Sequence, residues 1–303
     1  MSNLVFVSGD YCSGSTLLYT LFRKSERYYS IYEPLHERLL EYLIWPMLAD
    51  DHHFFVGNYY ASLKGFRRIP SLFDPSWGNT SLYMDRNSCN DAMHRYLSYV
   101  IGTALGQAPR AMLKENRFAF RLGWLRANFP GAKIVHIYRD KDAQWRSILR
   151  RVRQHLGRTD VGENDVNFRG FSIASWCEDL KSRFPQLEAG NSRNGYERFC
   201  KLWELSLSEQ QRYADISIDY WDLTHAFEDT CNQLWRCIGI EGIDNAELRQ
   251  FVIAPEEQQN IKVSTLKKRL GYWIDRLGRR YAKERIRARN YLEGHRPSMP
   301  ESF

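Results

Sequence analysis

A glycine-punctuated turn between a short apolar run and a helical pattern is the strongest constraint on the fold of this chain. The turn reads Gly9-Asp10-Tyr11-Cys12-Ser13-Gly14-Ser15-Thr16, directly after the apolar run Leu4–Val7. Over Ser15–Lys24, leucines and a phenylalanine then recur at helical spacing. Glycines let the backbone turn tightly, so that successive N–H groups and a helix N-terminus converge on one anion. The pattern therefore predicts a strand, a phosphate-binding loop and a helix.

Short β-like runs alternate with helical patterns along the rest of the chain, which indicates an α/β fold with a central, mainly parallel sheet flanked by helices. The expected strands are Asn3–Ser8, Tyr28–Tyr32, Arg110–Lys114, Lys133–Tyr138 and Ile216–Tyr220. A later helix is expected to begin near Thr224 as its N-cap and to bury one apolar face, which consists of Phe227, Cys231, Leu234, Trp235 and Ile238.

We expect residues 1–303 to form a single domain with two additions. An aromatic-rich insert near residues 50–90 has weak periodicity, and we interpret it as a lid over an active site. A basic helical tail near residues 262–296 carries much of the formal charge of +7. Such a tail fits nucleic acid, an acidic membrane, a phosphorylated ligand or plain solvation of a helix face, and the charge does not choose among them.

The cysteines and the apolar runs exclude several classes of protein. Six cysteines form no C-x-x-C pair and no short Cys/His cluster, which argues against a structural zinc site and a disulfide scaffold. The first apolar run is too short for a signal peptide, and no run approaches the roughly 18 apolar residues of a membrane span. We therefore expect a cytoplasmic protein with free thiols, no membrane span and no metal requirement.

The glycine turn differs from the nucleotide-triphosphatase loop G-x-x-x-x-G-K-[ST] at one informative position. Ser15 stands where those enzymes carry the lysine that neutralises the β- and γ-phosphates. Without that cation, hydrolysis of ATP or GTP loses its main fixed positive charge. A ligand with one 5′-diphosphate-like group fits the loop better.

Ser13-Gly14-Ser15-Thr16-Leu17-Leu18 resembles the 5′-phosphosulfate loop, R-S-G-[ST]-[ST], of sulfotransferases that use 3′-phosphoadenosine 5′-phosphosulfate (PAPS). Tyr32-Glu33-Pro34-Leu35-His36 is similar to the Y-E-P-x-x segment of carbohydrate sulfotransferases. This resemblance implies a P-loop-containing sulfotransferase-like fold, PAPS as donor and 3′,5′-ADP (PAP) as product. It also implies that Glu33 is the general base.

A second motif resembles the 3′-phosphate site of the same family. The run Ile134–Tyr138 ends in Arg139, and Ser147 follows eight residues later on the next helix. A guanidinium offers two charge-assisted donors to phosphate oxygens, and a hydroxyl completes the shell. The resemblance assigns cofactor binding to Cys12, Ser13, Gly14, Ser15, Thr16, Leu17, Arg139 and Ser147.

Two positions depart from the family pattern. Cys12 stands where relatives carry Arg or Lys before Ser-Gly, so either another cation stabilises the leaving group or the enzyme relies on backbone donors. The candidate cations, in falling order, are Lys114, Arg117 and Arg139. In aryl and steroid sulfotransferases a K-x-H run supplies a catalytic histidine, whereas this chain has Asn116 there. That difference favours Glu33 as the base.

The catalytic residues we expect are Glu33, Lys114 and His36, with His36 either orienting Glu33, touching the acceptor or serving structure only. For Glu33 to act near neutral pH, partial burial should raise its pKa. The acceptor is a hydroxyl or amine of a carbohydrate or small natural product, with no nucleic acid involved. The alternatives are a P-loop nucleotide kinase, a nucleic-acid-binding protein that uses the basic tail, and an inactive relative.

Overall fold

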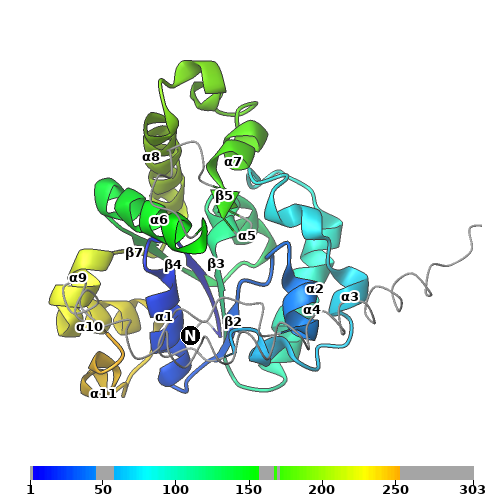
Figure 1. Ribbon diagram of the computed structural model, residues 1–303. Helices are drawn as coiled ribbons and strands as arrows, with labels where there is room; N and C mark the ends of the chain where they lie inside the picture. The colour runs from blue at the N-terminus through cyan, green and yellow to red at the C-terminus, as the bar shows by residue number, and fades with distance from the viewer. Residues whose placement is uncertain (1–2, 46–57, 157–166, 169–170, 253–303) are drawn as a thin grey trace, which may run out of the picture. The chain divides into compact units, whose positions relative to one another are not determined.

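A parallel sheet with helices on both faces organises the protein. The computed structural model describes residues 3–45, 58–156, 167–168 and 171–252, and Figure 1 shows their arrangement. Within these residues the larger sheet has the strand order β2-β3-β1-β4-β7, and every neighbouring pair is parallel. Its strands are β1 Leu4–Ser8, β2 Tyr29–Tyr32, β3 Ala111–Glu115, β4 Lys133–Tyr138 and β7 Ile216–Asp219. The α/β fold and all five expected strands are confirmed, with ends that differ by at most one residue.

The helices follow the strands in the alternating order of a parallel sheet. The longer ones are α1 Ser15–Lys24, α4 Asp91–Leu105, α6 Lys141–Leu156, α8 Gly195–Tyr213 and α10 Phe227–Ile238. The shorter ones are α2 Leu39–Ile44, α3 Ile69–Leu72, α5 Leu122–Asn128, α7 Ile173–Leu180, α9 Tyr220–His225 and α11 Asn245–Arg249. A two-stranded antiparallel ribbon pairs β5 Asn167–Phe168 with β6 Phe171–Ser172. Single 3₁₀ turns occupy Ala61–Leu63, Pro75–Gly78, Asn116–Phe118, Pro185–Leu187 and Ala189–Asn191.

Residues of β1 alternate between two buried faces, which explains why its sequence reads as a continuous apolar run. Phe6 packs edge-on against Phe118 and Phe129, and Ser8 donates a hydrogen bond to Gln210 of α8 at 2.6 Å. Val5 and Val7 are fully buried on the opposite face, where α1 contacts β1, β2 and β3. The central strand is therefore enclosed on both of its faces.

The predicted helix Ser15–Lys24 is confirmed at both of its ends. The predicted start of the later helix, near Thr224, is wrong. Asp219 caps an earlier helix, α9, by accepting a hydrogen bond from the Trp221 N–H at 2.8 Å. Thr224 lies near the end of that helix and donates to the Tyr220 carbonyl at 3.0 Å. The next helix, α10, begins at Phe227 after a break at Ala226. Its predicted apolar face is confirmed, because all five members are buried.

The described part of the insert, residues 58–90, contributes to the core rather than only covering it. Its buried aromatic side chains pack in the same cluster as the central sheet; they are Tyr59, Tyr60, Phe66, Phe73 and Trp77. Arg121 anchors the segment by donating to the carbonyls of Trp77, Thr80 and Ser81. The role of the insert as a lid stays a prediction, and the basic tail near 262–296 lies outside the described residues.

Candidate active site

Loops and helix starts that follow the five parallel strands meet at one edge of the sheet. In open α/β sheets, ligands bind at this carboxyl edge, where the strand order changes direction. In this sheet the strand order changes direction at the central strand, β1. Strands β2 and β3 lie on one side of it, and β4 and β7 lie on the other. The residues of interest that follow the strands are Gly9 after β1, Glu33 after β2, Asn116 after β3, Arg139 after β4 and Tyr220 after β7.

The turn after β1 presents backbone donors that the fold itself leaves free. Ser13 N–H bonds to Asp10 O at 3.0 Å, and Leu17 N–H bonds to Gly14 O at 2.8 Å. The hydrogen bonds within the described residues include none from the N–H groups of Gly14, Ser15 and Thr16. These three groups form the N-terminus of α1, so the loop can hold an anion as the sequence predicts.

Glycine is required at position 14 for two reasons. Its φ of 102° lies in the left-handed region, and a Cβ atom there would lie 2.2 Å from Cδ2 of Tyr220. The Tyr220 ring therefore packs directly on the loop. The centroid of the same ring lies 4.6 Å from the Arg139 guanidinium, so one tyrosine contacts both the loop after β1 and the cation after β4.

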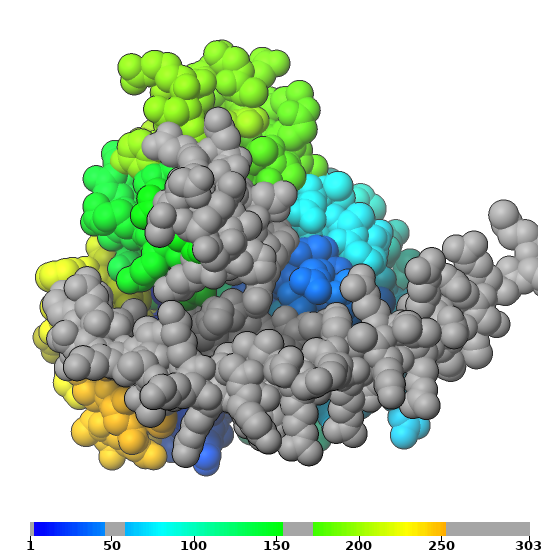
Figure 2. All heavy atoms as spheres, in the orientation of Figure 1, coloured from blue at the N-terminus to red at the C-terminus, as the bar shows by residue number. Residues whose placement is uncertain are grey.

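Arg139 lies at this edge without a carboxylate partner among the ion pairs of the described residues. Its Nε atom is buried and has no hydrogen-bond partner there. Burial lowers the pKa of Arg139, and the nearby Arg150 and Arg146 of α6 lower it further. A cation that is partly desolvated and surrounded by cations can bind an anion strongly. Ser147 is buried two turns into α6, whose outer surface is visible in green in Figure 2.

Glu33 sits at the centre of a buried cluster of charges. Lys114 Nζ donates to Glu33 Oε1 at 2.5 Å, Asn116 Nδ2 donates to the same oxygen at 3.1 Å, and Arg117 donates to Oε2 at 3.4 Å. The exposed fraction of Glu33 is only 7%, and that of Lys114 is 1%. The backbone of Glu33 has a φ of 39°, an uncommon left-handed conformation. Its N–H bonds to Lys114 O at 2.7 Å and so extends the β2–β3 ladder to this residue.

The predicted direction of the Glu33 pKa shift is wrong. Burial does raise the pKa, but the charges of Lys114 and Arg117 outweigh it and lower the pKa to about 2. Burial instead raises the pKa of the neighbouring Glu115, which accepts from Arg117 at 3.2 Å and from the Leu35 N–H at 2.7 Å. At rest, Glu33 is therefore a carboxylate that accepts hydrogen bonds on both oxygens.

Two side-chain links connect this cluster to the loop after β1. Ser15 Oγ donates to Asn116 Oδ1 at 3.1 Å, and Asn116 in turn donates to Glu33. Thr16 Oγ1 and the Tyr32 hydroxyl lie 3.1 Å apart, and Lys114 Nζ lies 4.4 Å from the Tyr32 ring centroid. The loop and the carboxylate are therefore parts of one site.

The side chain of His36 contacts groups other than the Glu33 carboxylate. Its Nδ1 accepts from the Arg38 N–H at 3.1 Å, and its ring packs against Tyr42 with centroids 4.9 Å apart. Burial lowers the pKa of His36 well below its ordinary value, so the ring is neutral. Within the described part of the chain, no side-chain hydrogen bond joins His36 to Glu33.

Cys12 stands where relatives carry a cation, and the side chains that could replace that cation differ in the number of carboxylates that they contact. Arg117 already contacts three carboxylates, those of Glu33, Glu37 and Glu115. Lys114 contacts Glu33 alone among the described ion pairs. Lys114 is therefore held by fewer carboxylates than Arg117 among the described residues.

Several members of the site are absent from the sequence prediction. Asn116 was noted only as a missing histidine, although it bridges Ser15 and Glu33. Asp10, inside the loop, accepts from Ser206 Oγ at 2.7 Å, and burial raises its pKa to about 6. In the sequence, Tyr220 is only the last residue of an expected strand, Ile216–Tyr220. A tyrosine one residue after a strand is too common a pattern to reveal its contact with Gly14 and Arg139.

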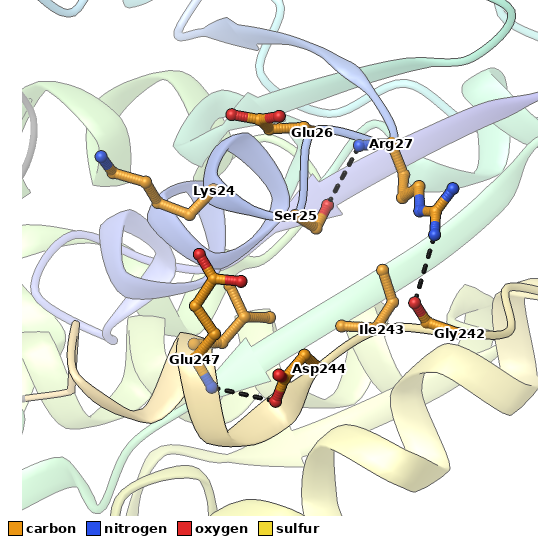
Figure 3. A pocket seen from close by; sticks show the side chains of 9 residues that line it. Lys24, Ser25, Glu26, Arg27, Gly242, Ile243, Asp244 and Glu247 are labelled. Atoms are coloured by element: carbon orange, nitrogen blue, oxygen red, sulfur yellow. Dashed lines mark hydrogen bonds between the residues drawn. The ribbon is translucent and has the colours of Figure 1, made fainter.

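A separate surface hollow of about 360 Å³ lies at the C-terminal end of α1. Figure 3 shows Lys24, Arg27, Asp244 and Glu247 around it, with Arg27 donating to the Gly242 carbonyl at 3.2 Å. Ten residues of helix, roughly 15 Å, separate this hollow from the loop after β1. It is remote from the charges described above, and cations and carboxylates alternate along its wall.

Neither a metal-binding cluster nor a membrane-spanning helix is present among the described residues. No group of His, Cys, Asp and Glu there is arranged to hold a metal ion. No helix of that part of the chain has the length and apolarity to span a membrane.

Comparisons with known proteins found a matching family model and similar solved structures. A family model described as "Sulfotransferase family" matches residues 5–244. Among solved structures, a sulfotransferase domain from the curacin biosynthetic pathway matches with a TM-score of 0.44 and 14% identity, covering 84% of this chain and 79% of that one. A sulfotransferase domain from the Synechococcus PCC 7002 olefin synthase matches with a TM-score of 0.40 and 14% identity, covering 87% and 82%. No curated protein matches.

Proposed function

The chain belongs to the sulfotransferase family, and from this premise we propose that it moves a sulfuryl group from PAPS to a hydroxyl or amine of a carbohydrate or small natural-product acceptor. The observation that carries the proposal is the pair of anion subsites at one sheet edge. One is the set of N–H groups at Gly14, Ser15 and Thr16, which have no hydrogen-bond partner within the described part of the chain. The other is Arg139, which lacks a carboxylate partner among the described residues and is joined to the loop through Tyr220.

The nucleotide fits these two subsites because it is phosphorylated at both ends. The loop after β1 would hold the 5′-phosphosulfate, with Ser13, Ser15, Thr16 and the backbone around Cys12 and Leu17 shaping the turn. Arg139 and Ser147 would hold the 3′-phosphate. Neither subsite supplies the second cation that a γ-phosphate needs, which disfavours ATP as the donor.

Glu33 is proposed as the general base of an in-line transfer. The acceptor O–H or N–H gives its proton to Glu33, the acceptor atom bonds to sulfur, and the bond from sulfur to the 5′-phosphate oxygen breaks. The electron pair of that bond leaves with 3′,5′-ADP. Positioning and charge stabilisation dominate such a step, as in phosphoryl transfer.

Lys114 explains how a carboxylate with a pKa of about 2 can accept a proton. As negative charge develops on the leaving nucleotide, the ammonium group is attracted towards it and its hold on Glu33 weakens. The pKa of Glu33 then rises at the moment when the acceptor proton arrives. The same lysine supplies the cation that relatives carry at the position of Cys12.

Radiolabelled PAPS tests this function. The enzyme is incubated with [³⁵S]PAPS and a panel of sugars, phenols, aliphatic alcohols and amines, and labelled products are separated from free sulfate. We expect labelled product and stoichiometric 3′,5′-ADP. Glu33→Gln should abolish transfer while 3′,5′-ADP still binds. Residual turnover above about a tenth, a loss below about 1.4 kcal/mol, would show that Glu33 is not the base.

A further inference from the structure

Asn116 connects the donor loop to the base through a chain of hydrogen bonds whose direction is determined. Glu33 is an ionised carboxylate, so it can only accept, and the amide nitrogen of Asn116 must face it at 3.1 Å. The amide oxygen of Asn116 therefore faces Ser15, also at 3.1 Å. An amide oxygen is an acceptor only, so the Ser15 hydroxyl must donate.

A serine hydroxyl has a single proton to donate. In the structure, Ser15 gives that proton to Asn116. Ser15 is also the first residue of α1, beside the free N–H groups that would hold the donor anion. It cannot donate to Asn116 and to a donor oxygen at the same time.

We propose that Asn116 is a positioning residue that competes with the donor for the Ser15 proton, so that donor binding releases the Asn116 carbonyl to orient the acceptor. This inference rests on the proposed function, because it requires the Ser15 hydroxyl to contact the donor. When Ser15 turns to the donor, Asn116 Oδ1 loses its partner while Nδ2 still holds Glu33. The released oxygen then accepts from a second O–H or N–H of the acceptor, beside the group that gives its proton to Glu33, and so orients the acceptor against the carboxylate.

Burial supports exclusive competition rather than sharing with solvent. Ser15 is 4% exposed and Asn116 is 7% exposed, so water has little access to replace a broken bond. Lys114 and Arg117 hold Glu33 independently of the amide. Donor binding can therefore break the Ser15–Asn116 bond without releasing the carboxylate. The acceptor site is complete only after the donor has bound, which predicts ordered binding.

The test is a double-mutant cycle read out by binding of 3′,5′-ADP, which needs no acceptor. Calorimetry compares wild type, Asn116→Ala, Ser15→Ala and the double variant, with Asn116→Leu as a second variant that fills the same space without an amide. Both single Asn116 substitutions should tighten 3′,5′-ADP binding about twofold to tenfold, the range of one neutral hydrogen bond. The gain should vanish in the Ser15→Ala background.

A purely structural role for Asn116 predicts the opposite sign, because a damaged site binds more weakly. Weaker or unchanged binding in both Asn116 variants would overturn the inference, and so would a gain that persists without the Ser15 hydroxyl. Failure of the proposed function has a different signature. In that case wild type itself does not bind 3′,5′-ADP, whatever residue occupies position 116.

Discussion

Replacing Glu33 by Gln should destabilise the protein strongly at neutral pH, because the carboxylate is held by buried cations. Its pKa in the folded protein is about 2, against 4.5 for the ordinary group. Each pKa unit corresponds to about 1.4 kcal/mol, so the charge of Glu33 contributes about 3 kcal/mol at pH 7. Glutamine keeps the approximate shape of the side chain, but it lacks this charge and has an NH₂ donor in place of one of the two accepting oxygens.

The pH dependence of the loss follows from the direction of the shift. A carboxylate with a lowered pKa stabilises the fold above the pKa of the unfolded chain and loses that effect as pH falls towards the folded value. The difference between wild type and Glu33→Gln should therefore be nearly constant from pH 7 to about pH 5 and fall to less than half of that value by about pH 3.

Urea denaturation followed by tryptophan fluorescence measures the difference at each pH. Glu41→Gln is the matched control, because Glu41 pairs with Arg38 at an exposed position with 54% of its side chain accessible. Its loss should stay below about 1 kcal/mol. A Glu33→Gln protein as stable as the Glu41→Gln control at pH 7 would refute the reasoning that Lys114 and Arg117 hold Glu33 in its charged form.

Three further predictions concern the loop and the second subsite. Arg139→Ala should weaken 3′,5′-ADP binding about tenfold to a hundredfold in calorimetry, while Arg27→Ala, in the remote hollow, leaves it unchanged; equal affinities would remove Arg139 from the site. Gly14→Ala should lower the melting temperature more than Gly65→Ala, because both glycines have a positive φ but only position 14 also lacks space for a Cβ. Equal shifts would show that the ring beside position 14 moves aside easily. Asp10→Asn should stabilise the protein above pH 6, because the raised pKa of about 6 means that the folded state binds a proton more tightly than the unfolded chain. In denaturant titrations this gain should vanish below about pH 4, and a gain independent of pH would contradict the burial of that charge.

The regular elements were predictable because local patterns determine them. The strands carry continuous apolar runs, which is how strands buried on both faces read. The glycine turn directly before an apolar helical pattern located α1 to the residue. The predicted helix start at Thr224 is wrong because Asp219 caps an earlier short helix, α9, which contains Thr224, and α10 begins only at Phe227.

The electrostatics of the site were not predictable in the same way. Glu33 and Lys114 are 81 positions apart in the sequence, and they meet because β2 pairs with β3 in a register that aligns Tyr32 with Lys114. A sequence shows that a glutamate follows a strand, but not which cations the neighbouring strand brings to it. The role of Asn116 was not predictable for the same reason, because its partners Ser15 and Glu33 follow two other strands.

We propose that two anion subsites at one sheet edge bind the two ends of one adenosine nucleotide. Calorimetric titration of the full chain with 3′,5′-ADP, 5′-AMP and 3′-AMP tests this proposal. We expect 3′,5′-ADP to bind more tightly than either monophosphate, and Arg139→Ala to reduce its affinity to that of 5′-AMP. Equal affinity of wild type for 3′,5′-ADP and 5′-AMP would contradict it.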